Sequence, residues 1–418
     1  MTIKGSVKTG SPEPDPQVDP RLVGEQPGLL GMLRDFRRRV AQGDLGSLPI
    51  VAGLVVVWAY FQYSNSNFLS PGNLTNLMLQ IAAVGTIAVG VVLVLLLGEI
   101  DLSVGAVSGL SAAVMAVLNV NRGVPATIAI AAGLGTGIAV GLIHGFWITR
   151  FRVPSFVVTL AGLLGWQGAL LYVLGDTGTV NLSDYGITRL AGTFYSPAVG
   201  WILGGLTIAA FMAISWRTRA SRTIAGLPVG SVRSFVLRAA ITAGGVALAL
   251  ATFNADRGLP LAVVIFVGTV VLFDLLTKKT RFGRQIYAVG GNAEAARRAG
   301  INVQRVRLLV FVLASLMAAV GGILGASRLL AVNQSSGSGD LLLIAIASAV
   351  IGGTSLFGGR GTAWSALLGA LVIGSISNGM DLLGKSSEVK FMVTGAALLA
   401  AATIDAVARR GRISSGRG

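Results

Sequence analysis

The sequence predicts an all-α membrane protein that crosses the bilayer about twelve times. Of its 418 residues, 53% are hydrophobic and only 12% are charged, and the mean hydropathy is +0.76. A soluble domain carries about twice that share of charge. The apolar stretches are continuous rather than alternating, and a run of roughly 20 apolar residues crosses lipid as a helix. We therefore expect membrane helices, some of them short or broken by glycine.

Twelve apolar stretches mark the expected spans. They are 48–63, 77–97, 104–119, 124–148, 155–174, 198–215, 235–252, 259–276, 307–326, 341–357, 362–380 and 389–407. With the N-terminus inside, 27 of the 33 Lys and Arg residues fall on inner segments. Basic residues gather on the cytoplasmic side, so we expect both termini in the cytoplasm and a multi-pass protein of a prokaryotic cytoplasmic membrane. Attraction to anionic lipid then explains the net charge of +16 without nucleic acid.

The chain is expected to have three parts. Residues 1–47 hold a proline-rich cytoplasmic disordered tail and a basic segment with apolar residues at helical spacing. That basic segment is either an amphipathic helix on the anionic membrane face or a solvated flank before the first span. Residues 48–408 form the transmembrane domain, and residues 409–418 form a basic cytoplasmic tail.

Residue types needed for most catalytic chemistry are missing. There is no cysteine and only one histidine, His144, so thiolate nucleophiles, disulfides and histidine-built zinc sites are unavailable. No Ser/His/Asp set is apparent. We expect no catalytic residue, no metal site and no cofactor bound by this chain, and we interpret His144 as a packed side chain near the inner end of its span.

One stretch imitates a nucleotide-binding loop. "GMDLLGKS", residues 379–386, has a glycine, four free positions and then Gly-Lys-Ser. A phosphate-binding loop needs a strand before it and a helix after it. Here a membrane helix precedes the pattern, and the topology places it outside. We interpret it as an outer turn built by Gly379, Gly384 and Lys385.

The longest inner loop, 277–306, contains an ordered pattern. Asn292 can cap a helix whose first turn holds Glu294, and basic residues follow near its end before Gly300. The predicted two-turn helix has alanine on one face, which suits close entry into a groove of a partner. A plain inner loop is the alternative that the residues leave open.

Five motifs give the chain a family resemblance. The loop "TRFGRQIYAVGGNAEAARRAGI" resembles the EAA loop of ABC importer permeases, specifically the ribose/xylose/arabinose-type sugar permeases. Four further motifs resemble the same family in the same order: "GEIDLSVGAVSGL" (98–110), "TRFRVPSFVVTLAGLL" (149–164), "VIGGTSLFGGRGT" (350–362) and "SNGMDLLGKSS" (377–387). In that family pattern the position of Lys385 need not be lysine.

The resemblance implies a permease subunit that imports a monosaccharide by alternating access. Its partners would be separate cytoplasmic ATPase subunits, which use ATP and Mg, an extracytoplasmic sugar-binding protein and a second copy of the chain. The ATPase-coupling residues it implies are Gly291, Asn292, Glu294, Ala295, Ala296, Arg297 and Gly300. An apparent insertion at 176–258 with two extra spans is similar to the longer xylose-type permeases, which points to xylose or another pentose.

Polar residues in the apolar part of the chain are candidates for the translocation pathway. They are Glu99, Asp101, Ser103, Thr354, Ser355 and Asn378. A carboxylate beside lipid is costly, so it must face a cavity, a partner or the interface. Glu99 and Asp101 either line the pathway or form an inner-loop pair held by helix ends, Ser103 and arginines; both interpretations are open.

Two further alternatives remain at this level. Gly98-x-x-x-Leu102-x-x-Gly105 and Gly352-x-x-x-Leu356-x-x-Gly359 share a spacing, which indicates either a pseudo-repeat of broken helices near the pathway or chance. The alternative function is an ion-coupled secondary sugar transporter. It would need ion-binding acids within the membrane, and Glu99 and Asp101 are the only close pair.

Overall fold

The computed structural model describes residues 48–414 except 228, 230 and 231. The expected N-terminal tail with its basic segment, and the last four residues, lie outside this described part. The chain divides into two compact units. The smaller unit holds residues 201–249, and the larger holds the described residues 48–200 and 250–414.

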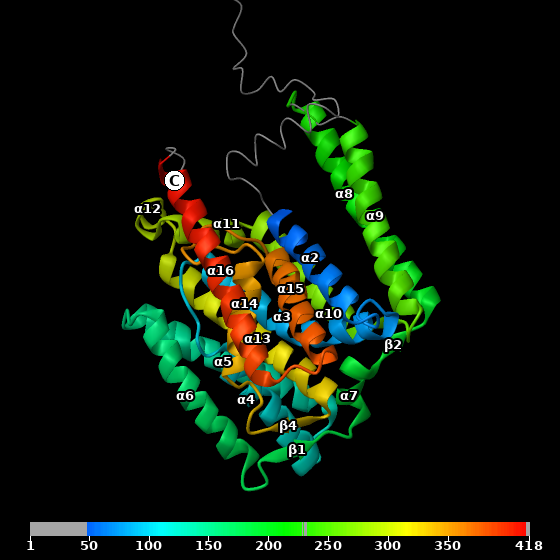
Figure 1. Cartoon of the computed structure of the whole chain (residues 1–418). Helices are drawn as coiled ribbons and strands as arrows, with labels where there is room; N and C mark the ends of the chain where they lie inside the picture. Colours follow the sequence, from blue (N-terminus) through cyan, green and yellow to red (C-terminus); the bar gives the residue numbers. More distant parts are fainter. Residues whose placement is uncertain (1–47, 228, 230–231, 415–418) are drawn as a thin grey trace, which may run out of the picture. The chain divides into compact units, whose positions relative to one another are not determined.

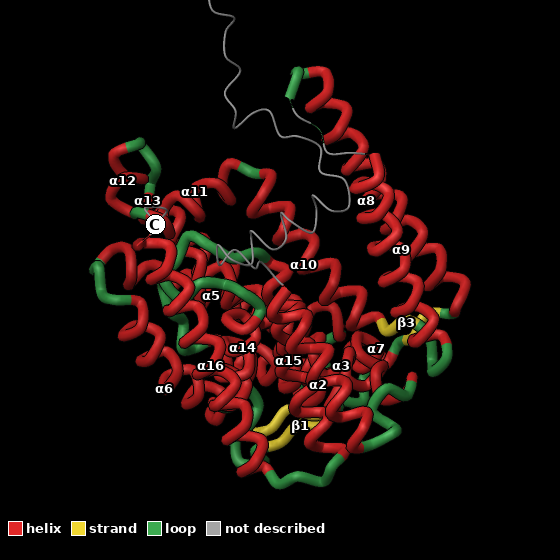
Figure 2. Tube along the Cα trace, turned by 45° about the horizontal axis from the view of Figure 1, so that its top comes forward, coloured by secondary structure: helices red, strands yellow, loops and turns green. Residues whose placement is uncertain are grey.

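Helices account for nearly all of the described chain (Figures 1 and 2). The long or apolar helices are α2 (Leu48–Ser64), α3 (Pro71–Leu96), α4 (Val104–Ala116, continued by a π-helical turn at Val117–Asn121), α5 (Ala126–Arg150), α6 (Ser155–Leu174), α8 (Pro197–Ile224), α9 (Val232–Asn254), α10 (Leu261–Lys279), α13 (Val303–Leu329), α14 (Gly339–Ile351), α15 (Ala363–Leu382) and α16 (Ser387–Ser414). The remaining helices are α7 (Tyr185–Gly192), α11 (Arg281–Gly291) and α12 (Ala293–Arg298). In the described residues nine helices are long and apolar enough to cross a membrane. The chain is thus an all-α, multi-pass membrane protein.

Each predicted span corresponds to a helix, but α14 is shorter than predicted. The apolar run suggested a span at 341–357, whereas the helix ends at Ile351 and has 13 residues. Such a helix is about 20 Å long, less than the roughly 30 Å of a bilayer core. The chain then turns through four glycines with positive φ at 353, 358, 359 and 361, which ends the helix because only glycine adopts this conformation readily.

The centre of the larger unit is formed by α3 and α13. Helix α13 packs against α3, α4 and α5, and most residues of α3 are buried on all sides. Glycines allow the close approach of α5 to α13: a Cβ at Gly141 would lie 2.6 Å from the Val312 Cα, and one at Gly145 would lie 3.0 Å from the Leu308 Cα. Small residues let membrane helices pack backbone to backbone. Gly135, by contrast, has open space beside it.

Two short strand pairs tie connections together in the larger unit. β1 (Thr179–Asn181) pairs antiparallel with β4 (Ala331–Asn333), with Val180 opposite Val332. β2 (Phe194–Tyr195) pairs antiparallel with β3 (Leu259–Pro260). Helices α11 and α12 lie at the opposite end of this unit from β1 and β4 in both views (Figures 1 and 2).

The smaller unit is a helical hairpin made from most of α8 and α9. Trp216 and Phe235 contact each other edge to face, with ring centroids 5.8 Å apart. Many large apolar side chains of these two helices are exposed, as expected for helices surrounded by lipid.

Candidate functional site

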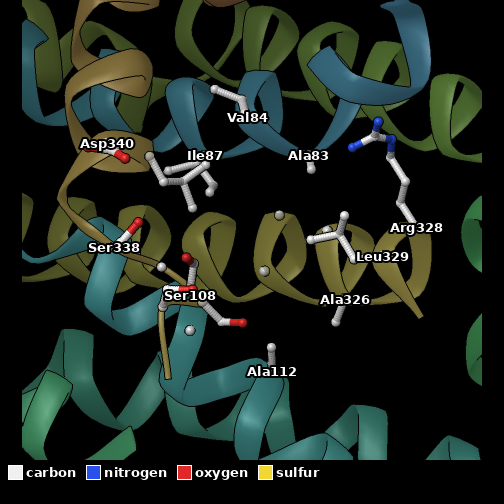
Figure 3. Close-up of a pocket in the computed structure, with 18 of the residues that line it drawn as sticks. Ala83, Val84, Ile87, Ser108, Ala112, Ala326, Arg328, Leu329, Ser338 and Asp340 are labelled. Carbon is white, nitrogen blue, oxygen red and sulfur yellow. The ribbon is translucent and has the colours of Figure 1, made fainter. Parts of the chain in front are cut away.

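A cavity of about 350 Å³ lies inside the larger unit, between α3, α4, α13, α14 and the connection that precedes α14 (Figure 3). Its walls combine small or apolar residues with a group of polar ones. The polar lining residues are Gln80, Ser108, Arg328, Asn333, Ser335, Ser336, Ser338 and Asp340. This concave site with a few convergent polar groups has the usual character of a small-molecule site.

The connection between α13 and α14 runs inward and forms one wall of the cavity. A Cβ at Gly337, whose φ is +75°, would lie 2.8 Å from the Gly109 nitrogen, so the connection lies directly on the backbone of α4. Asn333 stabilises the turn, because its Oδ1 accepts hydrogen bonds from the Ser335 nitrogen at 3.1 Å and the Ser335 hydroxyl at 2.9 Å. Helix α14 therefore begins beside the cavity with Asp340 in its first turn.

Three polar side chains of the cavity are free to bind a guest. Gln80, Arg328 and Asp340 form no side-chain hydrogen bond or ion pair within the described part of the chain. Asp340 and Arg328 lie at opposite ends of the close-up, with Ser338 beside Asp340 (Figure 3). The cavity thus offers an acceptor-only group, a donor-only group and an amide that does both. Its lining contains no aromatic ring.

A second, smaller cavity of about 50 Å³ lies further along helices α3 and α14, which also line the large cavity. Residues 80–87 of α3 line the large cavity, and Val91, Val94 and Leu95 line the small one together with Asp101. One oxygen of Asp101 accepts hydrogen bonds from the Ser103 nitrogen at 2.8 Å and the Ser103 hydroxyl at 2.6 Å. The other, Oδ2, is buried without a hydrogen-bond partner. The two cavities lie in series, and an unpartnered carboxylate oxygen belongs to the second.

Glu99, although adjacent in sequence, lies in a different environment. Its Oε1 pairs with the Arg307 Nη2 at 2.9 Å, and its Oε2 accepts a hydrogen bond from the Ser155 hydroxyl at 2.6 Å. Its side chain is only 16% exposed, and it lines neither cavity. Glu99 therefore connects the segment after α3 to the beginnings of α6 and α13.

The other sequence-predicted pathway residues are placed outside the large cavity. Thr354 and Ser355 are buried in the turn after α14, where the Ser355 nitrogen donates to the Arg360 carbonyl. Asn378 of α15 forms a reciprocal amide pair with Asn73 of α3, with N···O distances of 2.8 and 3.1 Å. His144 is buried and accepts a hydrogen bond from the Trp166 indole at 2.8 Å.

Three glycine-containing segments meet at a second site, which we call the glycine junction: Leu96–Gly98, Gly290–Gly291 and Gly358–Gly359. The Gly359 nitrogen donates to the Leu96 carbonyl at 2.9 Å. A Cβ at Gly290 would overlap that carbonyl oxygen and lie 2.8 Å from the Gly359 nitrogen. The two segments with matching glycine spacing therefore come together. Helix α11 packs on both backbone to backbone at Gly290, and its Tyr287 hydroxyl donates to the Gly361 carbonyl at 2.8 Å.

Helix α12 follows the junction and has the predicted order of residues. Asn292 Oδ1 accepts a hydrogen bond from the Ala295 nitrogen at 2.9 Å, and Gly300 has a φ of +84°. Arg297 and Arg298 donate hydrogen bonds to Glu294 and hold the pKa of its carboxyl below the usual range. Ala296 is buried, whereas Ala295, Ala299 and the charged side chains are exposed. The predicted second turn is shorter than expected, because α12 ends at Arg298.

Comparison with known proteins decides the class. The family model described as the permease component of branched-chain amino acid transport systems matches residues 73–402. The chain belongs to this permease family. Its relatives include the xylose transport system permease protein XylH of Escherichia coli K12, which is 37% identical over 88% of this chain and 93% of that protein. XylH of Haemophilus influenzae is 35% identical over 85% of this chain and 95% of that protein, and the ribose import permease protein RbsC of Bacillus subtilis is 33% identical over 87% and 94%. No solved structure gives a significant match.

The nucleotide-loop pattern of the permease lies in a turn between two helices. Helix α15 ends at Leu382, Gly384 has a φ of +61°, and α16 begins at Ser387. The Lys385 nitrogen donates to the Met380 carbonyl at 2.9 Å, and its side chain is exposed. The described residues around this turn include no strand, so the backbone needed to enclose phosphates is missing.

Sequence reasoning missed the large cavity of the permease, although a signal was present. The run "NQSSGSGD", 333–340, is a cluster of small polar residues ending in an acid, directly before an apolar stretch too short to span the bilayer. Discontinuous membrane helices with such starts commonly border substrate sites. Neither Arg328 nor Asp340 is among the pathway residues predicted from the sequence.

Proposed function

We propose that this permease is the membrane subunit of an ATP-driven importer for a pentose, with xylose as its substrate. The observation that carries the proposal is the similarity, over most of both chains, to xylose and ribose transport permeases. The large cavity supports it, because its free carboxylate, guanidinium and amide can each bind hydroxyl groups.

The proposed partners follow from this role. Separate cytoplasmic ATPase subunits hydrolyse ATP with Mg, an extracytoplasmic sugar-binding protein delivers the sugar, and a second copy of the chain completes the membrane part. The protein resides in the cytoplasmic membrane of a prokaryotic cell, and both of its termini face the cytoplasm. The strong bias of basic residues toward the segments predicted to be inside supports that orientation.

We further propose how the energy reaches the pathway. Helix α12 enters a groove of an ATPase subunit with its exposed face, involving Gly291, Asn292, Glu294, Ala295, Arg297 and Gly300, while the buried Ala296 holds the helix against its own chain. Movement of α12 reaches the glycine junction through α11. The backbone contact at Gly290 and the Tyr287–Gly361 hydrogen bond hold α11 to the segments after α3 and α14, so these segments move with α11.

The moving segments border the small cavity. Leu356 and Asp101 line it, and both belong to the two segments held by the glycine junction. Sugar released from the large cavity passes along α3 and α14 and meets the unpartnered oxygen of Asp101 before it reaches the cytoplasm. Ser103 orients that carboxylate, whereas Thr354, Ser355 and Asn378 support the surrounding helices.

Uptake by cells tests this proposal. A strain without its own xylose and ribose importers, expressing this permease with its neighbouring transporter genes, should accumulate labelled xylose. Depletion of ATP should abolish uptake, while a protonophore under conditions that preserve ATP should leave it intact. The opposite pattern would favour the ion-coupled alternative, which the similarity to transport system permeases does not support. No uptake of xylose, with ribose accumulated instead, would reassign the sugar.

A further inference from the structure

We infer that Asp340 and Arg328 form a charge-balanced pair that restricts the large cavity to neutral, hydroxyl-rich substrates and excludes charged compounds of the same size. The inference rests on the proposed function and adds the residues that determine its specificity.

The first argument is the absence of other partners. Neither charged side chain has a hydrogen bond or ion pair within the described residues. A salt bridge that served only stability would place the two groups against each other. Here they lie at separate ends of one cavity (Figure 3). Each is therefore available to a guest.

The second argument concerns charge. One carboxylate and one guanidinium give the lining a net charge of zero, because the other polar lining residues are amides and hydroxyls. A neutral sugar satisfies both groups, donating hydroxyl protons to Asp340 and accepting hydrogen bonds from Arg328. An anionic sugar acid meets Asp340 as a like charge, and a cationic amino sugar meets Arg328 as one. Both side chains are exposed, so this repulsion acts at short range, on a guest that sits in the cavity beside them.

The third argument is the position of Asp340. It lies in the first turn of α14, where the amide dipoles of the helix favour a negative charge. Ser338, at the N-cap position, makes no capping hydrogen bond with its side chain, so its hydroxyl also remains available beside Asp340.

The lack of cysteine in the chain permits a direct test. Ser338→Cys places a thiol near Asp340, and Leu329→Cys places one near Arg328; both positions line the cavity. In the assembled transporter we would measure the rates at which a cationic and an anionic methanethiosulfonate modify each thiol. We expect the cationic reagent to be favoured at 338 and the anionic reagent at 329, and millimolar xylose to slow both reactions. Ser66→Cys, in an exposed connection away from the cavity, is the control and should show neither effect.

Neutral variants of Asp340 and Arg328 then test whether these two side chains cause the reagent preference at each thiol. Asp340→Asn in the Ser338→Cys background should reduce the cationic preference about fivefold, and Arg328→Gln in the Leu329→Cys background should reduce the anionic preference about fivefold. Without added cysteines, each neutral variant should lower xylose uptake about tenfold, the loss expected for one charge-assisted hydrogen bond. Asp176→Asn and Arg122→Gln are the controls, since both residues are exposed and outside the cavity.

The outcomes separate the inference from the proposed function. Unchanged reagent preferences together with normal xylose uptake in both neutral variants would overturn the inference and leave the importer intact. Failure of the wild-type permease to transport xylose, with the reagent preferences as expected, would overturn the assignment of the sugar but not the charge balance. Two thiol positions keep the test valid where one variant fails to assemble.

Discussion

Replacement of Gly290 by alanine should damage the glycine junction, while the same change at the next residue should not. A Cβ at Gly290 would overlap the Leu96 carbonyl oxygen and lie 2.9 Å from the Leu96 carbonyl carbon and 2.8 Å from the Gly359 nitrogen. All three are backbone atoms that take part in one interaction, because the Gly359 nitrogen donates to that carbonyl. No side-chain rotation can make room for the methyl group.

The expected cost follows from these contacts. Forcing one carbon into a closely packed contact costs about 1–3 kcal/mol, and loss of the Leu96–Gly359 hydrogen bond adds about 1 kcal/mol. Gly291 gives the matched control, since a Cβ there would have nothing within 4 Å. At that position alanine should be neutral or slightly stabilising, because alanine is the better helix former.

Thermal unfolding of the detergent-solubilised permease measures the difference. The six tryptophans provide an intrinsic fluorescence signal. We expect Gly290→Ala to unfold at a lower temperature than wild type and Gly291→Ala to unfold at or above the wild-type temperature. Equal midpoints for the two variants would refute the argument that Gly290 of α11 packs directly on the backbone of Leu96 and Gly359. A second measurement, uptake per permease molecule in the membrane, should fall in Gly290→Ala if the junction also transmits movement.

Further predictions concern the coupling helix, the outer turn and the ion pair between Glu99 and Arg307. Glu294→Ala or Gly300→Pro should leave the amount of protein in the membrane unchanged but lower uptake severalfold and loosen its dependence on ATP hydrolysis; wild-type uptake in both would contradict a coupling role for α12. Lys385→Val should transport normally, and loss of transport at normal expression would show that the turn has another role. The purified chain alone should show no vanadate-sensitive ATP hydrolysis. Arg307→Gln should lower stability by about 1 kcal/mol, because the partly buried Glu99 loses its cation; in the double variant with Glu99→Gln the thermal midpoint should fall less than the sum of the single changes.

The helices could be predicted well because the residues that begin and end each helix are neighbours in the sequence. For α6 both predicted bounds agree with the structure: Pro154 precedes the first helical residue, and Gly175, with a φ of +63°, follows the last. For α14 the same reasoning failed at one end. Leu356 and Phe357 extended the predicted span to residue 357, but Gly353, with a φ of +99°, ends the helix through backbone conformation, which hydropathy does not register.

The candidate site was harder to predict because it depends on contacts between distant segments. Gln80, Ser108, Arg328 and Asp340 come from four helices, and no spacing rule brings them together. Polarity alone also selected Asn378, whose amide is fully engaged by Asn73. A polar residue in a span is informative only once its partner is known, and the partner is given by packing rather than by sequence.

The wall of the large cavity has a kinetic consequence. Tight sugar sites commonly use an aromatic ring as a flat surface for the sugar, and the residues that line this cavity include none. A guest held by hydrogen bonds alone has a short residence time, which favours flux over retention, because a conducting site must release what it admits. The sugar concentration at half-maximal uptake should therefore be set by capture outside the membrane, and strengthening the cavity, for instance with Leu329→Trp, should slow turnover.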